Sequence, residues 1–303
     1  MTVHEGFVTT ADGVRLFFRK FGTAPSTVLI PNGVYIVDDF APLATTRTLV
    51  FFDVRNRGRS DAVTDPAKIE RGVLQDVDDI DAIRRHLGVD RVQLIGHSYV
   101  GIMVALYAMK YPAHTDRVVQ IGSAQPHAGR QYPPDLMCVD ETFRAVMANI
   151  AALEKERAST DPVAFCEKFW TVLDPLYVTD PADVGKLAAW HRCDLPNERG
   201  LMKYLTGTIM PSIQRLNLTA DEFAKAQAPI LTIHGTRDRS APLGGGRDWA
   251  AELPNARLLA VKDAGHAPWI ESPALVFEAI ETFLNGRWPA GAERIAAAEV
   301  RPT

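Results

Sequence analysis

The chain has 303 residues, of which 47% are hydrophobic and 23% are charged, and its formal net charge is -4. This composition is typical of a globular protein with a large core, and it lacks the clustered positive charge that nucleic-acid binding requires. No apolar stretch is long enough to span a bilayer, and residues 1–13 do not resemble a secretory signal. We therefore expect a cytoplasmic protein with neither a membrane nor a nucleic-acid partner.

The cysteines are few and far apart in the sequence, at Cys138, Cys166 and Cys193. Their spacing fits neither a C-x-x-C metal site nor the disulfide framework of a small secreted protein. We therefore expect three reduced, mostly buried thiols and no bound metal or other cofactor.

The first 124 residues alternate short apolar runs with stretches of helical periodicity. The apolar runs predict strands over residues 14–22, 27–33, 48–56, 92–98 and 117–124. Apolar residues at helical spacing predict helices over residues 73–87, ending at Gly88, and 99–111, ending before Pro112. Parallel strands need crossover connections, usually helices, so this alternation predicts an α/β protein with a mostly parallel sheet covered on both faces.

The alternation stops near residue 125, and only helical periodicity follows until about residue 227. Two of these helices begin with Asp-Pro, at Asp161 and Asp180, which suits a capping residue followed by proline at the first helical position. Thr219 and Glu222 have the spacing of a capping box.

Strands return after this helical stretch, over residues 229–235 and 256–265, and a last helix is predicted over 273–286. The predicted organisation is a core of residues 1–124 and 228–288, an all-helical insertion over 125–227, and a flexible tail over 289–303.

Four aspartates lie within the predicted helix over residues 73–87. They are Asp76, Asp78, Asp79 and Asp81. A metal-binding cluster is conceivable, but a solvated helix face is the simpler interpretation.

Ser98 is the first residue that suggests chemistry. It follows the buried strand VQLIGH and precedes a helix, which is the context of a nucleophile elbow. The G-x-S-x-G pattern is incomplete, because Val100 stands where the second glycine is usual and Gly101 comes one residue later. Ser98 could equally be a helix cap. We predict that Gly96 and Gly101 make room for Val100 and that the Ser98 hydroxyl stays exposed.

Two further residues would complete a catalytic triad with Ser98. Asp238 follows the strand ILTIHG, and His266 lies in the loop between the last strand and the last helix. In an open α/β sheet, the carboxyl ends of the strands line the crevice where ligands bind. A serine needs a base, and the base needs an orienting acid, so Ser98, His266 and Asp238 together predict a nucleophilic triad. Asp263, three residues before His266, is the alternative acid.

These segments resemble the α/β-hydrolase fold family over nearly the whole chain. The resemblance is carried by GHSYVG at the elbow, IHGTRDRSAP at the acid, DAGHAPWIESP at the histidine, FFDVRNRGRSD after the fourth strand and TADGVRLFFRKFG at the opening hairpin. It implies an eight-stranded, mostly parallel sheet with helices on both faces, and it implies that residues 125–227 form a cap.

The resemblance also implies an oxyanion hole made of two backbone N–H groups. The family commonly has His-Gly-x after its third strand, whereas this chain has Asn32, Gly33 and Val34. We expect the N–H groups of Val34 and Tyr99 to be the donors, with Tyr35 as the alternative to Val34.

Several other side chains are candidates for substrate contact, namely Tyr35, His97, Trp170 and Trp269. A structural role is the simpler interpretation for His97, and helix packing is the simpler one for the tryptophans. Asp53 and Arg55 are expected to brace the loop after their strand through a buried ion pair or backbone contacts.

The resemblance implies a serine hydrolase that forms an acyl-enzyme on a small, fairly apolar carboxylic ester or lactone. Serine at position 98 argues against the dehalogenase and epoxide hydrolase branches, whose nucleophile is a carboxylate. Cleavage of a C–C bond and proline iminopeptidase-like amide hydrolysis remain open, although the peptidase's H-G-G-P-G and G-G-S-W-G segments are absent. A non-catalytic ligand-binding protein with this fold is the alternative from another class. The expected partner is a small-molecule substrate, and the expected state is a monomer or a homodimer.

Overall fold

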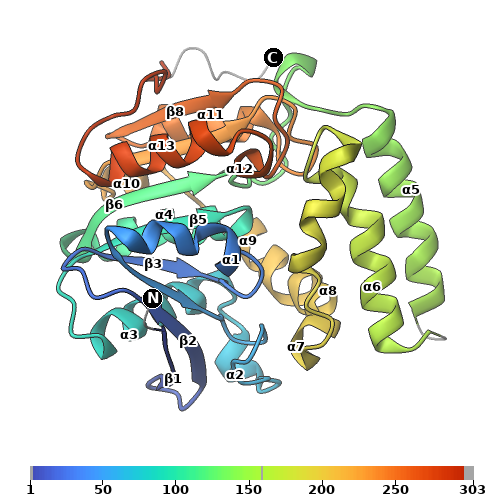
Figure 1. Ribbon diagram of the computed structural model, residues 1–303, viewed down its shortest axis with the longest axis horizontal. Helices are drawn as coiled ribbons and strands as arrows, with labels where there is room; N and C mark the ends of the chain where they lie inside the picture. The colour runs from blue at the N-terminus through green and yellow to red at the C-terminus, as the bar shows by residue number, and fades with distance from the viewer. Residues whose placement is uncertain (1–2, 158–159, 297–303) are drawn as a thin grey trace.

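A computed structural model of the protein describes residues 3–157 and 160–296. Its centre is an eight-stranded sheet in the order β1-β2-β4-β3-β5-β6-β7-β8 (Figure 1). The strands are β1 Val3–Thr9, β2 Arg15–Phe21, β3 Thr27–Pro31, β4 Thr48–Phe52, β5 Val92–His97, β6 Thr115–Ile121, β7 Ile230–Gly235 and β8 Ala256–Val261. Strand β2 runs antiparallel to both β1 and β4, and every pairing from β4 to β8 is parallel. The prediction of a mostly parallel eight-stranded sheet is confirmed.

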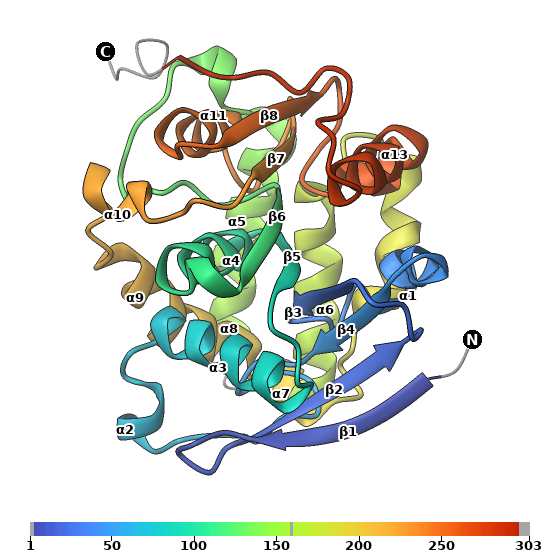
Figure 2. The same ribbon diagram turned by 90° about the vertical axis from the view of Figure 1, so that its left-hand side faces the viewer.

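Helices cover both faces of the sheet, as predicted (Figure 2). They are α1 Val37–Phe40, α2 Pro66–Ile69, α3 Val73–His86, α4 Tyr99–Lys110, α11 Leu243–Glu252, α12 Pro268–Glu271 and α13 Pro273–Leu284. Residues of α3, α4 and α11 pack in one hydrophobic cluster, and residues of α1, α12 and α13 pack in a second. Strands β3, β4, β5 and β7 are buried throughout, which explains why their sequences are continuous apolar runs.

Residues 125–227 contain helices and no strand in the part that the structure describes. The helices are α5 Glu141–Glu156, α6 Pro162–Leu173, α7 Pro196–Arg199, α8 Leu201–Tyr204, α9 Met210–Gln214 and α10 Ala220–Ala224, with a π-helical turn over Leu205–Ile209 and 3-10 helices over Pro134–Leu136, Asp174–Leu176 and Pro181–Trp190. Further 3-10 helices in the core span Ala41–Thr45 and Pro112–His114. Helices α5 to α8 lie on the side toward which the arrowheads of β3 and β6 point (Figure 1).

The helix caps predicted from the sequence are present. The side chains of Asp161 and Asp180 accept hydrogen bonds from the first backbone N–H groups of their helices, and Thr219 accepts one from the N–H of Glu222. These contacts satisfy donors that the helix itself leaves without a partner.

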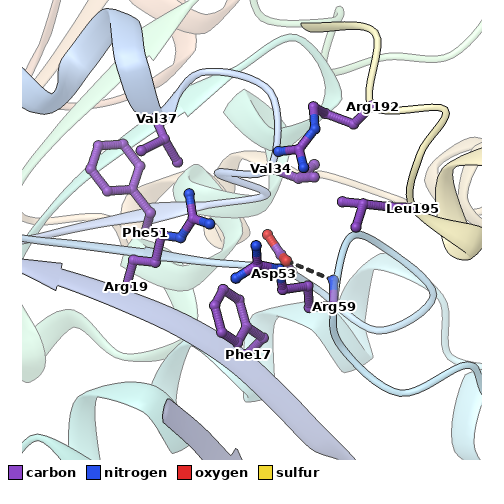
Figure 3. Close-up of a pocket in the computed structure, with 9 residues that line it drawn as sticks. All are labelled: Phe17, Arg19, Val34, Val37, Phe51, Asp53, Arg59, Arg192 and Leu195. Carbon is purple, nitrogen blue, oxygen red and sulfur yellow. Dashed lines mark hydrogen bonds between the residues drawn. The ribbon is translucent and has the colours of Figure 1, made fainter. Parts of the chain in front are cut away.

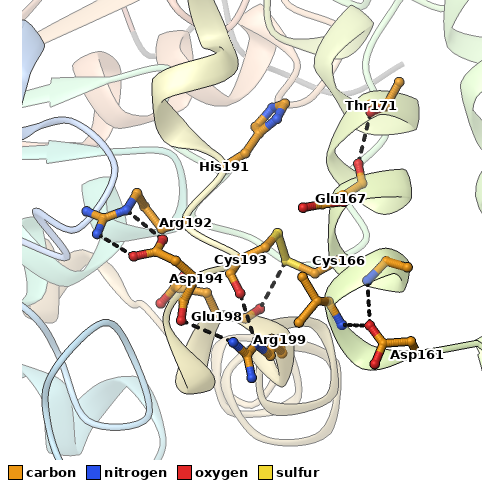
Figure 4. Close-up of a disulfide and its surroundings, with 12 residues drawn as sticks. Asp161, Cys166, Glu167, Thr171, His191, Arg192, Cys193, Asp194, Glu198 and Arg199 are labelled. Atoms are coloured by element: carbon orange, nitrogen blue, oxygen red, sulfur yellow. Dashed lines mark hydrogen bonds and ion pairs between the residues drawn. A yellow bond between two sulfur atoms is a disulfide. The ribbon is translucent and has the colours of Figure 1, made fainter.

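The prediction of three reduced thiols was wrong for two of them. Cys166 on α6 and Cys193, just before α7, form a disulfide whose Cα atoms are 5.8 Å apart, whereas Cys138 is free (Figure 4). The two residues are 27 positions apart in the sequence, and only the packing of α6 against α7 brings them together. Sequence spacing carries no signal for such a pair.

The interpretation of the four aspartates on α3 as a solvated face was also wrong for three of them, since only Asp78 is partly exposed. Asp76, Asp79 and Asp81 are buried, and Asp79 forms an ion pair at 2.7 Å with Arg55, which is itself buried. Both carboxyl oxygens of Asp76 are buried without a hydrogen-bond partner among the described residues, and burial raises the pKa of Asp76 well above its usual value. Burial therefore favours the neutral form of Asp76 over the charged one.

The first part of the predicted flexible tail is held against the sheet. Leu258 of β8 and Glu293 exchange two backbone hydrogen bonds, of 2.8 and 2.9 Å, and Ala292 is buried. Strand β8 is an edge strand, so its free backbone groups can pair with a following segment. The rest of the predicted tail, residues 297–303, lies outside the described residues. No helix in the described part of the chain is long and apolar enough to cross a membrane.

Candidate active site

Ser98 occupies a sharp turn between β5 and α4. Its backbone has φ 61° and ψ -131°, a region that residues with a side chain rarely adopt. Such strain persists only where the surroundings enforce it, and it is common at functional sites. The turn places Ser98 half-buried at the N-terminus of a 12-residue helix, where backbone N–H groups favour negative charge.

Two glycines allow this turn to pack closely. A β-carbon at Gly96 would lie 2.5 Å from the carbonyl oxygen of Val100, and one at Gly101 would lie 2.6 Å from the hydroxyl of Ser123. Val100 itself is buried in the hydrophobic cluster between the sheet and α3. Gly96 therefore makes room for the backbone carbonyl of Val100, whereas Gly101 makes room for Ser123, just after β6, and not for Val100.

His266 and Asp238 form a buried hydrogen-bonded pair. Nδ1 of His266 lies 2.7 Å from Oδ2 of Asp238, and neither side chain is exposed. The other carboxylate oxygen, Oδ1, accepts the N–H groups of Ser240 and Ala241 at 2.8 and 2.7 Å. Burial alone would raise the pKa of Asp238, but its contacts with the rings of His266 and His234 hold this pKa well below its usual value. Asp238 is therefore a carboxylate, and the Nδ1 of His266 carries the proton.

The second ring nitrogen of His266 is left free by this arrangement. Nε2 is buried and has no hydrogen-bond partner among the described residues, so the Ser98 hydroxyl is not bonded to it in this structure. Catalytic hydrogen bonds are often long without substrate. Because Nδ1 holds the proton, Nε2 presents a lone pair that can accept one.

Asp263, the alternative acid, lies apart from this pair. It occupies a turn with φ 57°, and its carbonyl oxygen accepts a hydrogen bond from Thr179. Asp238 is thus the carboxylate that contacts His266.

His97 supports His266 from the side of the sheet. Its Nε2 lies 3.0 Å from the carbonyl oxygen of His266, and its Nδ1 lies 2.9 Å from the hydroxyl of Tyr35. A carbonyl oxygen can only accept, so Nε2 of His97 donates and Nδ1 accepts from Tyr35. Burial, together with the nearby ring of His266, lowers the pKa of His97 well below its usual value, which keeps the ring neutral.

A cavity of about 460 Å³ opens above Ser98 between the sheet and the helical segment. It is lined by Asn32, Tyr35, Arg57, Ser98, Tyr99, Ala124, Phe143, Met147, Phe169, Trp170, Leu173, Leu176, Tyr177, Leu201, Met202, Leu205, Thr206, Met210, Arg239, Ser240 and Ala241. This lining is mostly apolar and contains no acidic side chain. Its volume is that of a site for a small organic molecule.

The candidates for substrate contact divide into two pairs. Tyr35 and Trp170 line the cavity, as expected. His97 and Trp269 are outside the lining and are almost completely buried, and their rings pack edge to face at 4.7 Å. The indole N–H of Trp269 donates to Asp39 at 3.0 Å, so Trp269 belongs to the core rather than to the substrate pocket.

The two candidate oxyanion donors are placed differently. Tyr99 is the first residue of α4, whose opening N–H groups have no partner within the helix, and it lines the cavity beside Ser98. The side chain of Val34 instead lines a second cavity of about 20 Å³, with Asp53, Arg19, Arg59 and Arg192 (Figure 3). Asn32 and Tyr35, which flank Val34 in the same turn, face the large cavity. The loop therefore reaches Ser98 with residues on both sides of Val34.

Asp53 and Arg55 do not pair with each other, contrary to one of the two expectations. Arg55 pairs with Asp79 and with Asp12, while Asp53 accepts the backbone N–H of Arg59 at 2.9 Å (Figure 3). The second expectation, backbone contacts that brace the loop, is met by Asp53.

Sequence reasoning missed two features of the site. The ring of Tyr177 packs edge to face on His266 with centroids 5.1 Å apart, and it lines the cavity. Arg57 and Glu198 form a buried ion pair at the cavity wall, with Nη2 and Oε2 2.8 Å apart. Tyr177 and Glu198 lie in the helical segment, far from the recognised motifs, and nothing in their local sequence marks them.

The chain belongs to the α/β hydrolase fold family, whose family model matches residues 30–273. A similar protein is the proline iminopeptidase PfmaB of Pestalotiopsis fici, 25% identical over 81% of this chain and 84% of its own. A pimeloyl-acyl-carrier protein methyl ester esterase of Nitrosomonas europaea is 27% identical over 60% of this chain and 67% of its own. Among solved structures, the esterase EaEST of Exiguobacterium antarcticum matches 93% of this chain and 100% of its own with a TM-score of 0.71 and 16% identity. Membership of this family and these relatives support a hydrolase activity.

Proposed function

We propose that the protein is a serine hydrolase that cleaves a carboxylic ester or lactone through an acyl-enzyme on Ser98. The observation that carries this proposal is the free, buried Nε2 of His266, whose proton-bearing Nδ1 is held by Asp238. In this proposal, Nε2 takes the proton of Ser98 as its oxygen attacks the substrate carbonyl, and gives this proton to the alcohol oxygen that leaves. Nε2 then takes a proton from water as the water attacks the acyl-enzyme, and returns it to Ser98 as the acid is released. The N–H of Tyr99 and that of Val34 or Tyr35 stabilise the oxyanion.

Residues 125–227 act as a cap in this proposal. They supply most of the apolar lining of the cavity that contains Ser98. A water-poor site strengthens the hydrogen bonds that hold the oxyanion.

The bond cleaved is proposed from the chemistry of the cavity lining. An aminopeptidase substrate carries a protonated amine, and no carboxylate lines the cavity to receive it. An ester or lactone with an apolar acyl group carries no charge and fits this lining. The esterase relative supports this choice, and the iminopeptidase relative makes amide hydrolysis the rival outcome.

The test is a panel of p-nitrophenyl esters with acyl chains of two to ten carbons, small lactones and proline p-nitroanilide. We expect turnover of the esters with a preference for medium acyl chains. A protein that cleaves the anilide and leaves the esters intact would contradict the proposed bond.

The cytoplasmic location stays a prediction from the sequence. The disulfide between Cys166 and Cys193 argues against a cytoplasmic location, because the cytosol keeps most thiols reduced. Fractionation of the native host's cells, with an antibody to the chain, would decide the location.

A further inference from the structure

One wall of the cavity carries a polar cluster that the proposed triad does not use. It consists of Asn32, Arg57, Tyr99 and Glu198, and the first three line the cavity beside Ser98. Asn32, Arg57 and Glu198 are at least 96% buried. In a mostly apolar cavity, such a group of polar side chains fixes the orientation of what binds there.

The charges of this cluster cancel within the protein. Nε and Nη2 of Arg57 bond to the two carboxylate oxygens of Glu198 at 2.9 and 2.8 Å, and Glu198 also accepts the N–H of Gly58 at 2.7 Å. Arg239, the other cation of the lining, pairs with Asp140 at 2.8 Å. A substrate carboxylate would therefore enter without a free positive charge to meet it, and its desolvation would be costly.

The hydrogen bonds of the cluster leave one donor unused. The hydroxyl oxygen of Tyr99 lies 3.2 Å from Nη1 of Arg57 and 3.2 Å from Nδ2 of Asn32, and it accepts from both. The hydroxyl hydrogen of Tyr99 is then free. In the opposite orientation of the amide, Tyr99 donates to Asn32 and the amide hydrogens are free instead.

Asn32 also has a buried polar atom without a hydrogen-bond partner. Its Oδ1 is buried without a hydrogen-bond partner among the described residues, and its backbone is held at φ 58°. Buried polar groups are normally paired, and exceptions are concentrated where a ligand or water completes them. This oxygen is an acceptor, so it calls for a donor such as a water molecule, whereas the free donor of the wall next to Ser98 is the hydroxyl of Tyr99.

We propose that the hydroxyl of Tyr99 donates a hydrogen bond to a neutral acceptor oxygen, such as a ketone or ether oxygen, in the acyl group of the substrate. This inference rests on the proposed ester hydrolysis and narrows its substrate class to oxygenated acyl esters. Tyr99 would then have two functions, with its backbone N–H at the oxyanion and its hydroxyl on the acyl group.

The test compares five methyl esters: hexanoate, its 3-, 4- and 5-oxo derivatives, and the monomethyl ester of glutaric acid, which carries a carboxylate. We expect the best oxo ester to exceed hexanoate in kcat/KM by roughly threefold to tenfold, the effect of one hydrogen bond, and the carboxylate ester to fall below hexanoate. In Tyr99→Phe the ratio of oxo ester to hexanoate should fall to about one, since the ring remains and the hydroxyl is lost. The matched control is Tyr111→Phe at the far end of α4, whose hydroxyl bonds Asp78 and which should keep the wild-type ratio.

Equal rates for oxo esters and hexanoate, a preference for the carboxylate ester, or an oxo preference that survives in Tyr99→Phe would each overturn the inference. If Tyr99→Phe does not fold, as judged by circular dichroism, the wild-type ranking decides alone. Absence of all ester turnover together with an unlabelled Ser98 would reject the proposed function and this inference with it. Ester turnover without an oxo preference rejects this inference alone.

Discussion

The carboxylate of Asp238 holds Nδ1 of His266 at 2.7 Å, and this contact fixes which nitrogen of the imidazole can act as a base. We expect Asp238→Asn to lower kcat for an ester by about 10³- to 10⁴-fold, because an amide does not enforce the same tautomer. The measurement is steady-state hydrolysis of p-nitrophenyl butyrate. The matched variant Asp263→Asn should stay near wild-type activity. The reverse pattern would assign the acid to Asp263.

His97 is expected to act through His266 without touching substrate. It donates to the carbonyl oxygen of His266 and lies outside the cavity lining, so His97→Asn should lower kcat roughly tenfold or more and leave KM within about twofold. The control is His86→Gln, since His86 is exposed on α3. A rise in KM at unchanged kcat would show that His97 contacts substrate instead.

The disulfide between Cys166 and Cys193 is expected to stabilise the helical segment. Closing a loop between residues 27 positions apart constrains the unfolded chain, and the usual gain is about 3 kcal/mol. Cys166→Ser with Cys193→Ser should therefore lower the urea midpoint, whereas Cys138→Ser should leave it close to wild type. Titration of the unfolded, unreduced protein with a thiol reagent should find one free thiol. Three free thiols would contradict the pairing.

The motifs show what the sequence could predict and what it could not. Ser98, Asp238 and His266 each follow a strand in a recognisable local pattern, so the expected sheet topology alone predicted that they lie near one another, and the contact between Asp238 and His266 agrees with this. Glu198 and Cys193 gave no such signal, because their partners, Arg57 and Cys166, become neighbours only through packing of the helical segment. Burial was also misjudged at Asp76, since a charged residue type on an amphipathic helix is normally exposed. The sheet topology could therefore be predicted from the sequence, whereas the residue pairs formed by the helical segment could not.

Asp53 should make folding stability depend on pH. Burial raises the pKa of Asp53 from 3.8 to about 6, although the hydrogen bond from the N–H of Arg59 acts in the opposite direction. Between these values the folded protein binds more protons than the unfolded chain, so this contribution to stability falls as pH rises through the window and is constant above it. Asp53→Asn removes this titration.

We expect the free energy of unfolding of Asp53→Asn, relative to wild type, to increase by about 3 kcal/mol between pH 4 and pH 7, at 1.36 kcal/mol per pKa unit. Urea denaturation across this range measures it. Arg19, Arg59 and Arg192 line the same small cavity as Asp53. Parallel profiles for the two proteins would mean that Asp53 titrates normally.

The most direct test of the central claim is covalent labelling of Ser98. Native protein is incubated with a fluorophosphonate, and intact mass and peptide mass spectra locate the adduct. We expect one adduct per chain, on Ser98, with loss of ester hydrolysis in proportion to labelling, and neither labelling nor hydrolysis in Ser98→Ala. An unlabelled Ser98 in folded wild-type protein, or ester turnover that persists in Ser98→Ala, would contradict the assignment of Ser98 as the nucleophile.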